Sequence, residues 1–491
     1  MTDVLAPYVT NLDRDIFALR NLPEEVVAVL FAYYSRSRDD LRTNLKRLLN
    51  DQELDLLGAA PAMPSLSAAQ AKAKAFHEKW VVGYGHASVA EHAVVHLAVE
   101  RISIVAAKAL EEARLAAYTE KSTRYVRFDE GTLVTDIGLP AKLQAQYEAA
   151  ARGLLARYAV LADEVEAKLI ARYPTPDETS PKAHAATLRA HACDLLRGLL
   201  PAGVPTNVGL TANARVLETH IGKLLGSPLA EVRRMAEGLR DEGRVIAPTL
   251  LKYTAPRPHR DNARARVFHA HGALHRVSNA RPEEVALVDV TPEALRTVAA
   301  AVQCELFGTA WDEAWHAALD PSHAKKIVAA YLDERGPHDA PLRALEQVQF
   351  RFEIRCDYGA WRDLQRHRLV SATTPRLSTR EGYVYAAELE SLGVGDTVRR
   401  ALDDVPVVYD QLAAEHPWEA QYVVPLAYQV RYVMSANLRE LFHFCELRAA
   451  RQGHPAYRRV AQKVARAVLN ECPWLDPHFR IDWNDYPFAR H

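Results

Sequence analysis

The chain has 491 residues, of which 49% are apolar and 25% charged, the composition of an ordinary globular protein with room for several domains. Its formal net charge of -1 excludes a general attraction to nucleic acid or to anionic membranes. The sequence shows no secretory signal, no apolar run that could span a bilayer and no CxxC spacing among its five cysteines, so we expect a cytoplasmic protein.

Apolar periodicity predicts the regular elements. Apolar residues recur at three- and four-residue steps over 38–49, 141–169 and 457–469, which predicts helices there. Alternation predicts strands over 92–100 and 347–354. The segment 253–270 is rich in Pro and Arg and has no apolar period, so we expect a linker. This divides the chain into a first half, 1–252, the linker, 253–270, and a second half, 271–491.

Four sequence blocks occur once in each half and in the same order, which indicates an internal duplication. In chain order, the blocks and their second copies are PEEV at 23 and 282, HASVAEHAVV at 86 facing HDAPLRALEQ at 338, EARLAAYTEKSTRYV at 112 facing RHRLVSATTPRLSTREGY at 366, and TANARVLETHIGKL at 211 facing SANLRELFHFCELR at 435. Similarity of a single block arises easily by chance, whereas four blocks in one order do not.

Two basic segments of the second half are candidate ligand-binding sites. Arg366, His367 and Arg368 precede a stretch rich in hydroxyl groups and arginine. Guanidinium groups offer a fork of donors that suits phosphate or a ring carbonyl edge, so this composition favours a nucleotide over a solvated basic turn. The block 437–448 is predicted to be a helix with polar groups on two faces. An ordinary amphipathic helix with snorkelling arginines is the alternative.

A metal site is a weaker alternative for the first half. His86, His92 and His96 lie close in sequence to Glu91, but their order is not His-Glu-x-x-His. We therefore expect no metal.

Together these blocks resemble the flavin-dependent thymidylate synthases. That family is marked by His-x-Ser/Thr-x-x-Glu-His, by Arg-His-Arg followed by Ser-x-Arg-Tyr, and by an Asn-x-Arg helix with a further arginine. The first half has GHASVAEHA and STRY, and the second half has RHR and NLRELFHFCELR. The resemblance covers most of the chain, once per half. It implies an α+β fold made of two tandem, helix-rich copies, each with a small antiparallel sheet.

The resemblance also implies a reaction and an assembly. Family members methylate dUMP at C5 of the uracil to give dTMP. FAD is the cofactor, and NADPH and methylenetetrahydrofolate are co-substrates. No cysteine nucleophile is needed. Family members form tetramers whose active sites lie between subunits, so we expect a homodimer of this two-copy chain to imitate a tetramer.

The two halves have lost complementary parts of the family's site. The first half has Glu112-Ala113-Arg114 in place of Arg-His-Arg and Leu224 in place of the activating arginine, and the second half has Gln421 where an arginine is expected. We therefore predict composite sites built from both halves. The resemblance implies that Arg448 is catalytic, that dUMP is bound by Glu120, Ser122, Thr123, Arg124, Arg197, Arg366 and Arg448, and that FAD is bound by His86, Ser88, Glu91, Arg366, His367, Arg368, Asn437, Arg439 and His443.

One departure from the family pattern bears on the substrate. Asp363 stands where an amide-bearing nucleotide contact is usual, three positions before Arg366. A carboxylate there repels phosphate but can accept a hydrogen bond from a ring N–H. Two alternatives thus remain beside dUMP methylation: a related flavoprotein acting on another pyrimidine nucleotide, and an inactive homologue that binds nucleotide or flavin.

Overall fold

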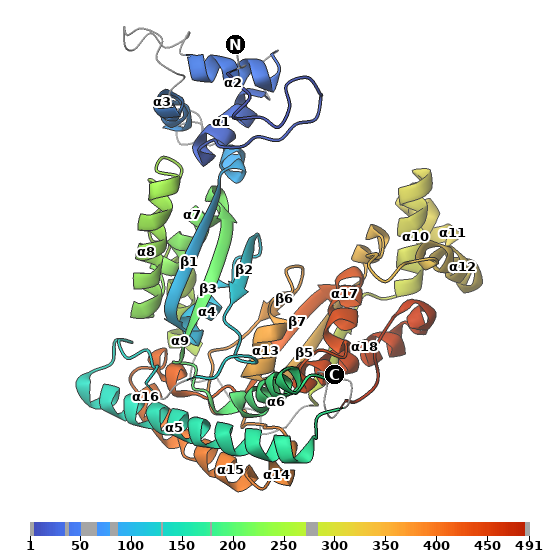
Figure 1. The fold of residues 1–491 in the computed structure, drawn as a ribbon. Helices are drawn as coiled ribbons and strands as arrows, with labels where there is room; N and C mark the ends of the chain where they lie inside the picture. The colour runs from blue at the N-terminus through green and yellow to red at the C-terminus, as the bar shows by residue number, and fades with distance from the viewer. Residues whose placement is uncertain are drawn as a thin grey trace.

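The computed structural model describes residues 4–34, 39–50, 66–78, 87–128, 131–176, 179–271 and 283–486. Many helices surround two small antiparallel sheets, one of three strands in the order β1-β3-β2 and one of four strands in the order β4-β5-β7-β6 (Figure 1). This confirms the expected α+β class with one small sheet in each half.

The first half opens with a helical unit that has a small apolar core of its own. This unit comprises α1 (Glu24–Tyr34), α2 (Leu41–Asn50) and α3 (Leu66–Phe76). The first sheet and its helices follow, namely η2 (Ala87–His92), β1 (Val94–Ser103), α4 (Ile104–Leu110), β2 (Ala116–Glu120), α5 (Ala141–Arg172), α6 (Pro181–Leu196), η3 (Arg197–Leu199), β3 (Pro205–Asn213), α7 (Ala214–Leu225) and α8 (Ala230–Ile246). The segment predicted to be a linker contains the helix α9 (His259–His271).

The second half repeats this plan with different additions. Its elements are β4 (Val285–Val290), α10 (Ala294–Phe307), α11 (Trp311–Ala317), α12 (Pro321–Leu332), η5 (Arg343–Gln347), β5 (Gln349–Asp357), α13 (Tyr358–Leu364), β6 (Ser371–Thr373), α14 (Glu388–Ser391), α15 (Gly395–Asp403), α16 (Val405–Ala413), η6 (Glu419–Val423), β7 (Gln429–Asn437), α17 (Leu438–Ala449), α18 (Pro455–Glu471) and η7 (Pro473–His478). The helices predicted at 38–49, 141–169, 437–448 and 457–469 and the strands at 92–100 and 347–354 are confirmed as α2, α5, α17, α18, β1 and β5.

The duplication extends to individual hydrogen bonds. Asn213 ends β3 and caps α7 by accepting from the Val216 N–H at 2.9 Å, and Asn437 ends β7 and caps α17 by accepting from the Glu440 N–H at 2.8 Å. An asparagine side chain satisfies a helix N–H that has no partner within the helix. The same cap therefore makes the same turn from strand to helix in each half.

The two halves pair with each other through backbone. Ala202 N donates to Val424 O at 2.9 Å, and Leu426 N donates to Leu200 O at 3.0 Å. These segments lie at corresponding places before Asn213 and Asn437, so the two bonds are reciprocal, as they are at a twofold axis. One continuous apolar core spans both halves. The halves are thus related within one chain by a pseudo-twofold axis.

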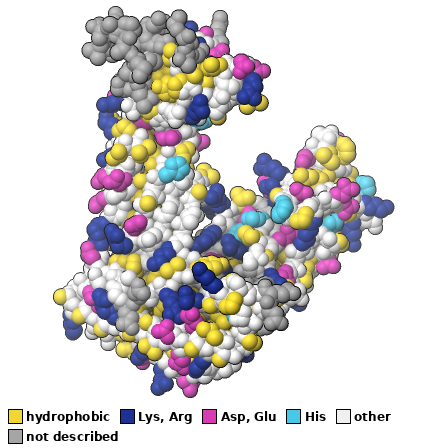
Figure 2. Space-filling view, viewed as in Figure 1, with side chains coloured by type: hydrophobic (Ala, Val, Ile, Leu, Met, Phe, Trp, Pro, Cys, Tyr) yellow, Lys and Arg dark blue, Asp and Glu magenta, His cyan; other side chains and the backbone are white. Residues whose placement is uncertain are grey.

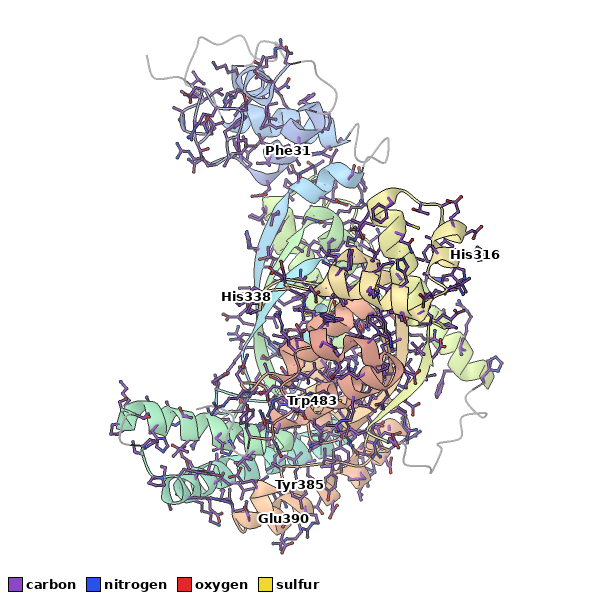
Figure 3. All side chains as sticks on the ribbon, turned by 90° about the vertical axis from the view of Figure 1, so that its right-hand side faces the viewer. Phe31, His316, His338, Tyr385, Glu390 and Trp483 are labelled. Atoms are coloured by element: carbon purple, nitrogen blue, oxygen red, sulfur yellow. The ribbon has the colours of Figure 1, made fainter. Side chains whose placement is uncertain are left out.

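The figures show a molecule with two arms above a common base. In Figure 1, one arm carries α1–α3 above the first sheet, the other carries α10–α12, and α5 with α14–α16 forms the base. Figure 3 places Phe31 near one end of the molecule and Tyr385 with Glu390 at the other. Among the described residues, no helix combines the length and the apolar character that crossing a membrane requires.

Candidate active site between the halves

A cavity of about 490 Å³ lies where the two halves meet. Both copies of the basic motif line it, Glu112-Ala113-Arg114 from the first half and Arg366-His367-Arg368 from the second. Figure 2 shows basic side chains gathered in the hollow between the arms. The charged residues of the lining are Lys108, Arg114, Arg264, Arg366 and Arg368 with Glu111, Glu112 and Glu120. Positive side chains outnumber acids, which suits an anionic ligand.

The sheets position both motifs in the same way. Asp357 ends β5 and caps α13 by accepting from the Ala360 N–H at 2.8 Å, and Ser103 ends β1 and caps α4 by accepting from the Ala106 N–H at 2.9 Å. Each capped helix is short, and the motif follows directly after it. The pseudo-twofold axis therefore brings the two motifs to one cavity from opposite sides.

Glu120 of the first half reaches the basic motif of the second. Its side chain is 2% exposed, forms an ion pair with Arg362, and accepts from Arg366 Nη2 at 3.2 Å. Arg114, the arginine that the first motif retains, donates to Ser371 Oγ of the second half at 3.1 Å. Residues of both halves thus form one polar network.

Arg448 is held by a buried histidine. Its Nε donates to His367 Nε2 at 2.9 Å, while His367 Nδ1 lies 2.8 Å from a carboxylate oxygen of Glu440. Because Nε2 accepts, the proton of the neutral ring sits on Nδ1 and is donated to Glu440. Burial lowers the pKa of His367, in keeping with a neutral ring. Both nitrogens of His367, a predicted FAD contact, are therefore occupied within the protein.

Tyr457 joins the predicted catalytic arginine to a nucleotide-binding arginine of the other half. Its ring lies under the Arg448 guanidinium at 5.6 Å, and its Oη accepts from Arg124 Nη1 at 3.3 Å. Arg124 also forms a two-point ion pair with Asp194, with distances of 2.9 and 3.0 Å. Arg124 comes from the loop after β2, and Ser122 Oγ supports this loop by accepting from the Arg124 N–H at 3.1 Å.

Arg197 is paired with Asp363. Arg197 Nη1 lies 3.2 Å from Asp363 Oδ2, and the two side chains are 5% and 16% exposed. Burial opposes ionisation of Asp363, but the surrounding arginines, Arg197 first, outweigh it and hold the pKa of Asp363 below its ordinary value. Arg197 Nη2 is buried and has no hydrogen-bond partner among the residues that the structure describes.

The residues predicted to bind FAD are divided between two sheets. Glu91, in η2 with Ser88, pairs with Arg215 of α7 in its own half. Arg439, beside Asn437 at the start of α17, instead bonds Pro341 O at 2.7 Å and Glu346 at 3.0 Å. The other predicted residues are placed as follows: Arg368 and His443 are exposed beside Arg448 along a smaller cavity of about 250 Å³, Thr123 is buried in its loop, and His86 lies outside the described residues.

The family model described as thymidylate synthase complementing protein matches residues 25–249 and again residues 286–474. The chain belongs to this family. The two matches fall on either side of α9 and cover one sheet each.

The relatives found include full-length and partial ones. A protein of Chlamydia pneumoniae named UPF0159 protein is 33% identical over 99% of this chain and 95% of its own length. A UPF0159 protein of Thermoplasma acidophilum is 26% identical over 86% of this chain and 91% of its own length. A protein of a Mycobacterium species named flavin-dependent thymidylate synthase is 33% identical over 35% of this chain and 66% of its own length. The similarity to the two UPF0159 proteins thus extends over both halves of this chain.

Across the pseudo-twofold axis from Arg197, the corresponding polar groups of this family member bond one another. Gln421 takes the place that Arg197 has in the first half, accepts from the Leu377 N–H at 3.1 Å and donates to Trp418 O at 2.9 Å. Nearby, Glu231 is 6% exposed and bonds both Ser103 and Tyr422. The arrangement around Arg197 and Arg448 is therefore not reproduced on the other side of the axis.

Several partners in the site were missed by sequence reasoning. They are Arg362, Asp194, Tyr457 and Glu440. Arg124 and Asp194 are far apart in the chain, so no motif spacing connects them. The sequence could have indicated Glu440, because an acidic residue among apolar residues near the start of a helix needs a hydrogen-bond partner when it is buried.

Proposed function

We propose that the chain carries out flavin-dependent reductive methylation of a uracil ring at C5. Because the chain belongs to this family, the conversion of dUMP to dTMP is the first candidate for this reaction. One observation carries the proposal. Tyr457 contacts both Arg448, the predicted catalytic residue of the second half, and Arg124, a predicted nucleotide-binding residue of the first. The two complementary remnants of the motif thus meet at one place within one chain.

The residues around the cavity fit FAD as the cofactor. Guanidinium and ammonium groups there suit the pyrophosphate of a dinucleotide, and Trp361 and Tyr118 add aromatic surface. We propose that Arg366, Arg368 and His443 hold it, since Arg366 and Arg368 line this cavity and all three line the smaller one beside Arg448. Bound FAD, once reduced by NADPH, supplies the hydride, while methylenetetrahydrofolate supplies the carbon.

Arg448 supplies the electrostatic part of the chemistry. A guanidinium that faces a uracil carbonyl stabilises the negative charge that develops when C5 becomes nucleophilic, an effect worth roughly 3 kcal/mol. His367 fixes the direction of this guanidinium without neutralising it. Of the five cysteines, all within the described residues, none lines the cavity, so no thiol is placed to attack C6.

The assembly follows from the pseudo-twofold axis. One chain already contains the pairing that two single-copy subunits would make, so a homodimer of this chain corresponds to a tetramer of single copies. We expect light scattering to give twice the chain mass of 54.8 kDa. Because Leu224 and Gln421 stand where the second of the two pseudo-equivalent sites would need arginines, we expect about one FAD per chain. Two FAD per chain would contradict the single-site assignment.

A second candidate acceptor is favoured by the Arg197–Asp363 ion pair. The carboxylate of Asp363 is paired with Arg197, which the family resemblance assigns to the phosphate of dUMP. This favours a uracil compound other than dUMP in the same reaction.

Tritium release from C5-labelled substrate tests the proposal. The full chain is supplied with FAD, NADPH and methylenetetrahydrofolate, and dUMP and other labelled uracil compounds are compared. Release that requires all three additions is the expected result. If FAD binds and no uracil compound releases tritium, the proposed reaction is wrong.

A further inference from the structure

We infer that Arg264, in the helix that joins the two halves, binds the pyrophosphate of FAD. The inference rests on the proposed function, since it concerns the cofactor of that reaction. Helix α9 (His259–His271) lies outside both copies of the fold, because one family match ends before it and the other begins after it. Arg264 nevertheless lines the cavity between the halves. The segment that joins the copies therefore takes part in the site.

Helix α9 contacts both halves beside this cavity. Near its start, Arg260 Nη1 donates to Glu112 Oε2 of the first half at 2.9 Å. Towards its end, the guanidinium of Arg376, in the second half, lies 5.5 Å from the centre of the Phe268 ring. Glu112 itself lines the cavity. The helix is thus held against the first half by an ion pair and against the second by a cation–π contact.

The spacing of these contacts directs Arg264 to the cavity. Arg260, Arg264 and Phe268 follow one another at steps of four residues, so they lie along one face of the helix. Since the first and the last of the three contact the two halves, the middle one faces the space between them. Arg266 is two positions further on, about 200° around the helix, and so lies on the opposite face.

The charge of Arg264 is available to a ligand. Glu112 stands in place of the first arginine of the motif, and its ion pair with Arg260 offsets the negative charge that this replacement brings. Among described carboxylates, Arg264 pairs with Asp261 alone, at 3.4 Å, and Arg260 shares that carboxylate at 3.5 Å. The Arg264 side chain is 57% exposed. A guanidinium with five N–H donors and one shared partner retains donors for an anion.

Arg264 belongs to a group of cations that face one another across the cavity. Burial lowers the pKa of Lys108, Glu112 raises it, and the positive charge of Arg264 lowers it again, so the two cations are close enough to repel each other. An anion bound between them relieves this repulsion. A pyrophosphate presents several anionic oxygens and can therefore be shared by several donors of this kind.

The position of Arg264 assigns it to the phosphates and not to the flavin ring. Two cavities meet at Arg366, His367 and Arg368, which line both of them. The smaller one is lined by Arg448, where we propose that the reaction takes place, and the larger one by Arg264. A dinucleotide with its ring beside Arg448 therefore extends its phosphates into the larger cavity.

Titration of the full chain with FAD, followed by flavin fluorescence, tests the inference. Arg264→Ala removes one charged phosphate contact and should raise the dissociation constant of FAD by about tenfold. Riboflavin has the same ring and no phosphate, so its dissociation constant should not change. Arg264→Lys keeps the positive charge and should recover most of the affinity for FAD.

Arg266→Ala is the matched control, because it removes the same exposed side chain from the opposite face of α9. It should leave the dissociation constant of FAD unchanged. Hydrogen exchange gives a readout of the contact itself. FAD should slow amide exchange over residues 259–271 in the unmodified chain and in Arg266→Ala, but not in Arg264→Ala.

Three results would overturn the inference. The first is an unchanged dissociation constant of FAD in Arg264→Ala. The second is an equal loss of affinity in Arg264→Ala and Arg266→Ala, which would indicate a general effect of charge. The third is weaker binding of NADPH with unchanged binding of FAD, which would assign Arg264 to the other dinucleotide.

The same measurements separate the inference from the proposed function. Weaker FAD binding by Arg264→Ala, together with no tritium release from any uracil compound, supports the role of Arg264 and refutes the methylation. Tritium release by the unmodified chain, together with unchanged FAD binding by Arg264→Ala, supports the methylation and refutes the role of Arg264. An unmodified chain that does not bind FAD refutes both.

Discussion

Arg448 donates a hydrogen bond from Nε to Nε2 of His367 over 2.9 Å, and Glu440 lies 2.8 Å from the opposite nitrogen of the same ring. The line from Glu440 through His367 to Arg448 fixes both the tautomer of the imidazole and the direction of the guanidinium. A carboxylate bonded directly to Arg448 would neutralise it. An intervening neutral ring orients the arginine and leaves its charge for the substrate.

Replacing Arg448 by lysine should abolish most turnover. Lysine has no Nε–H to donate to His367 and no planar fork to place against a ring carbonyl. We expect tritium release to fall by about a hundredfold or more, the effect of losing one preorganised donor, while FAD titration gives an unchanged dissociation constant. Arg451→Lys, an exposed site in the loop after α17, is the matched control. Full turnover in Arg448→Lys would show that Arg448 is not catalytic.

Glu440 should act through His367 rather than on the substrate. In Glu440→Leu the buried Nδ1–H loses its acceptor, so we expect kcat to fall about tenfold, KM to stay unchanged and the free energy of unfolding to fall by about 1–3 kcal/mol. Glu440→Gln keeps an oxygen that can accept from Nδ1–H and should recover most of kcat. A rise in KM with unchanged kcat would instead mean that Glu440 contacts the substrate.

The sequence allowed the prediction of those features that depend on local pattern. The helices α5 and α18 and the strands β1 and β5 follow from apolar periodicity, because an element that buries one face must repeat apolar residues with its own period. The duplication was visible because four sequence blocks recur in the same order, and in the last of them Asn213 and Asn437 make the same helix cap in each half.

The pairings within the site could not be predicted in the same way. Asp194 meets Arg124 only because α6 packs beside the loop after β2, and Asp363 meets Arg197 only because the halves pair about the pseudo-twofold axis. Both contacts depend on how elements pack across the chain. The same holds for Glu91, which bonds Arg215 of its own half and so lies apart from the second group of predicted FAD residues.

The Arg197–Asp363 ion pair should show strong thermodynamic coupling. Arg197→Ala or Asp363→Ala alone leaves one buried charge without its partner, and we expect each to lower the free energy of unfolding by about 3 kcal/mol. The double variant removes both charges and should lose clearly less than the sum of the two. Urea denaturation of the four proteins measures the coupling. Additive losses would show that the two side chains do not interact.

Glu111 should make the free energy of unfolding depend on pH in a range above the one in which a glutamate ordinarily titrates. It lines the cavity beside Gln365, and burial, reinforced by Glu120, raises its pKa to about 7 from an ordinary value of 4.5. The folded state therefore holds the proton more tightly than the unfolded state, and this contribution to stability is lost as the pH rises from about 4.5 to about 7.

Glu111→Gln removes that dependence. From pH 5 to pH 8 the free energy of unfolding of the variant should rise relative to the unmodified chain by about 2 kcal/mol, as urea denaturation at both pH values would show. Glu164→Gln, at an exposed i,i+4 ion pair with Lys168 on α5, is the control and should follow the unmodified chain. A constant difference between Glu111→Gln and the unmodified chain across this range would contradict the raised pKa.

Gly203 should tolerate no side chain, because the two halves meet there. A Cβ at this position would lie 2.1 Å from Tyr147 Oη and 3.0 Å from Tyr422 O. Tyr147 cannot move aside, since it is fully buried and donates to Val134 O at 2.7 Å. We expect Gly203→Ala to lower the free energy of unfolding by about 2–3 kcal/mol through overpacking.

Gly153→Ala is the matched substitution for this test. Gly153 lies within α5, and a Cβ there would have no atom within 4 Å. Alanine is the better helix former, so this variant should gain up to about 1 kcal/mol. Opposite shifts in urea denaturation are therefore expected from the same chemical change at two sites. Equal stability of Gly203→Ala and the unmodified chain would mean that the backbone at Gly203, whose N–H donates to Tyr422 O at 2.8 Å, does not approach the second half as closely as described.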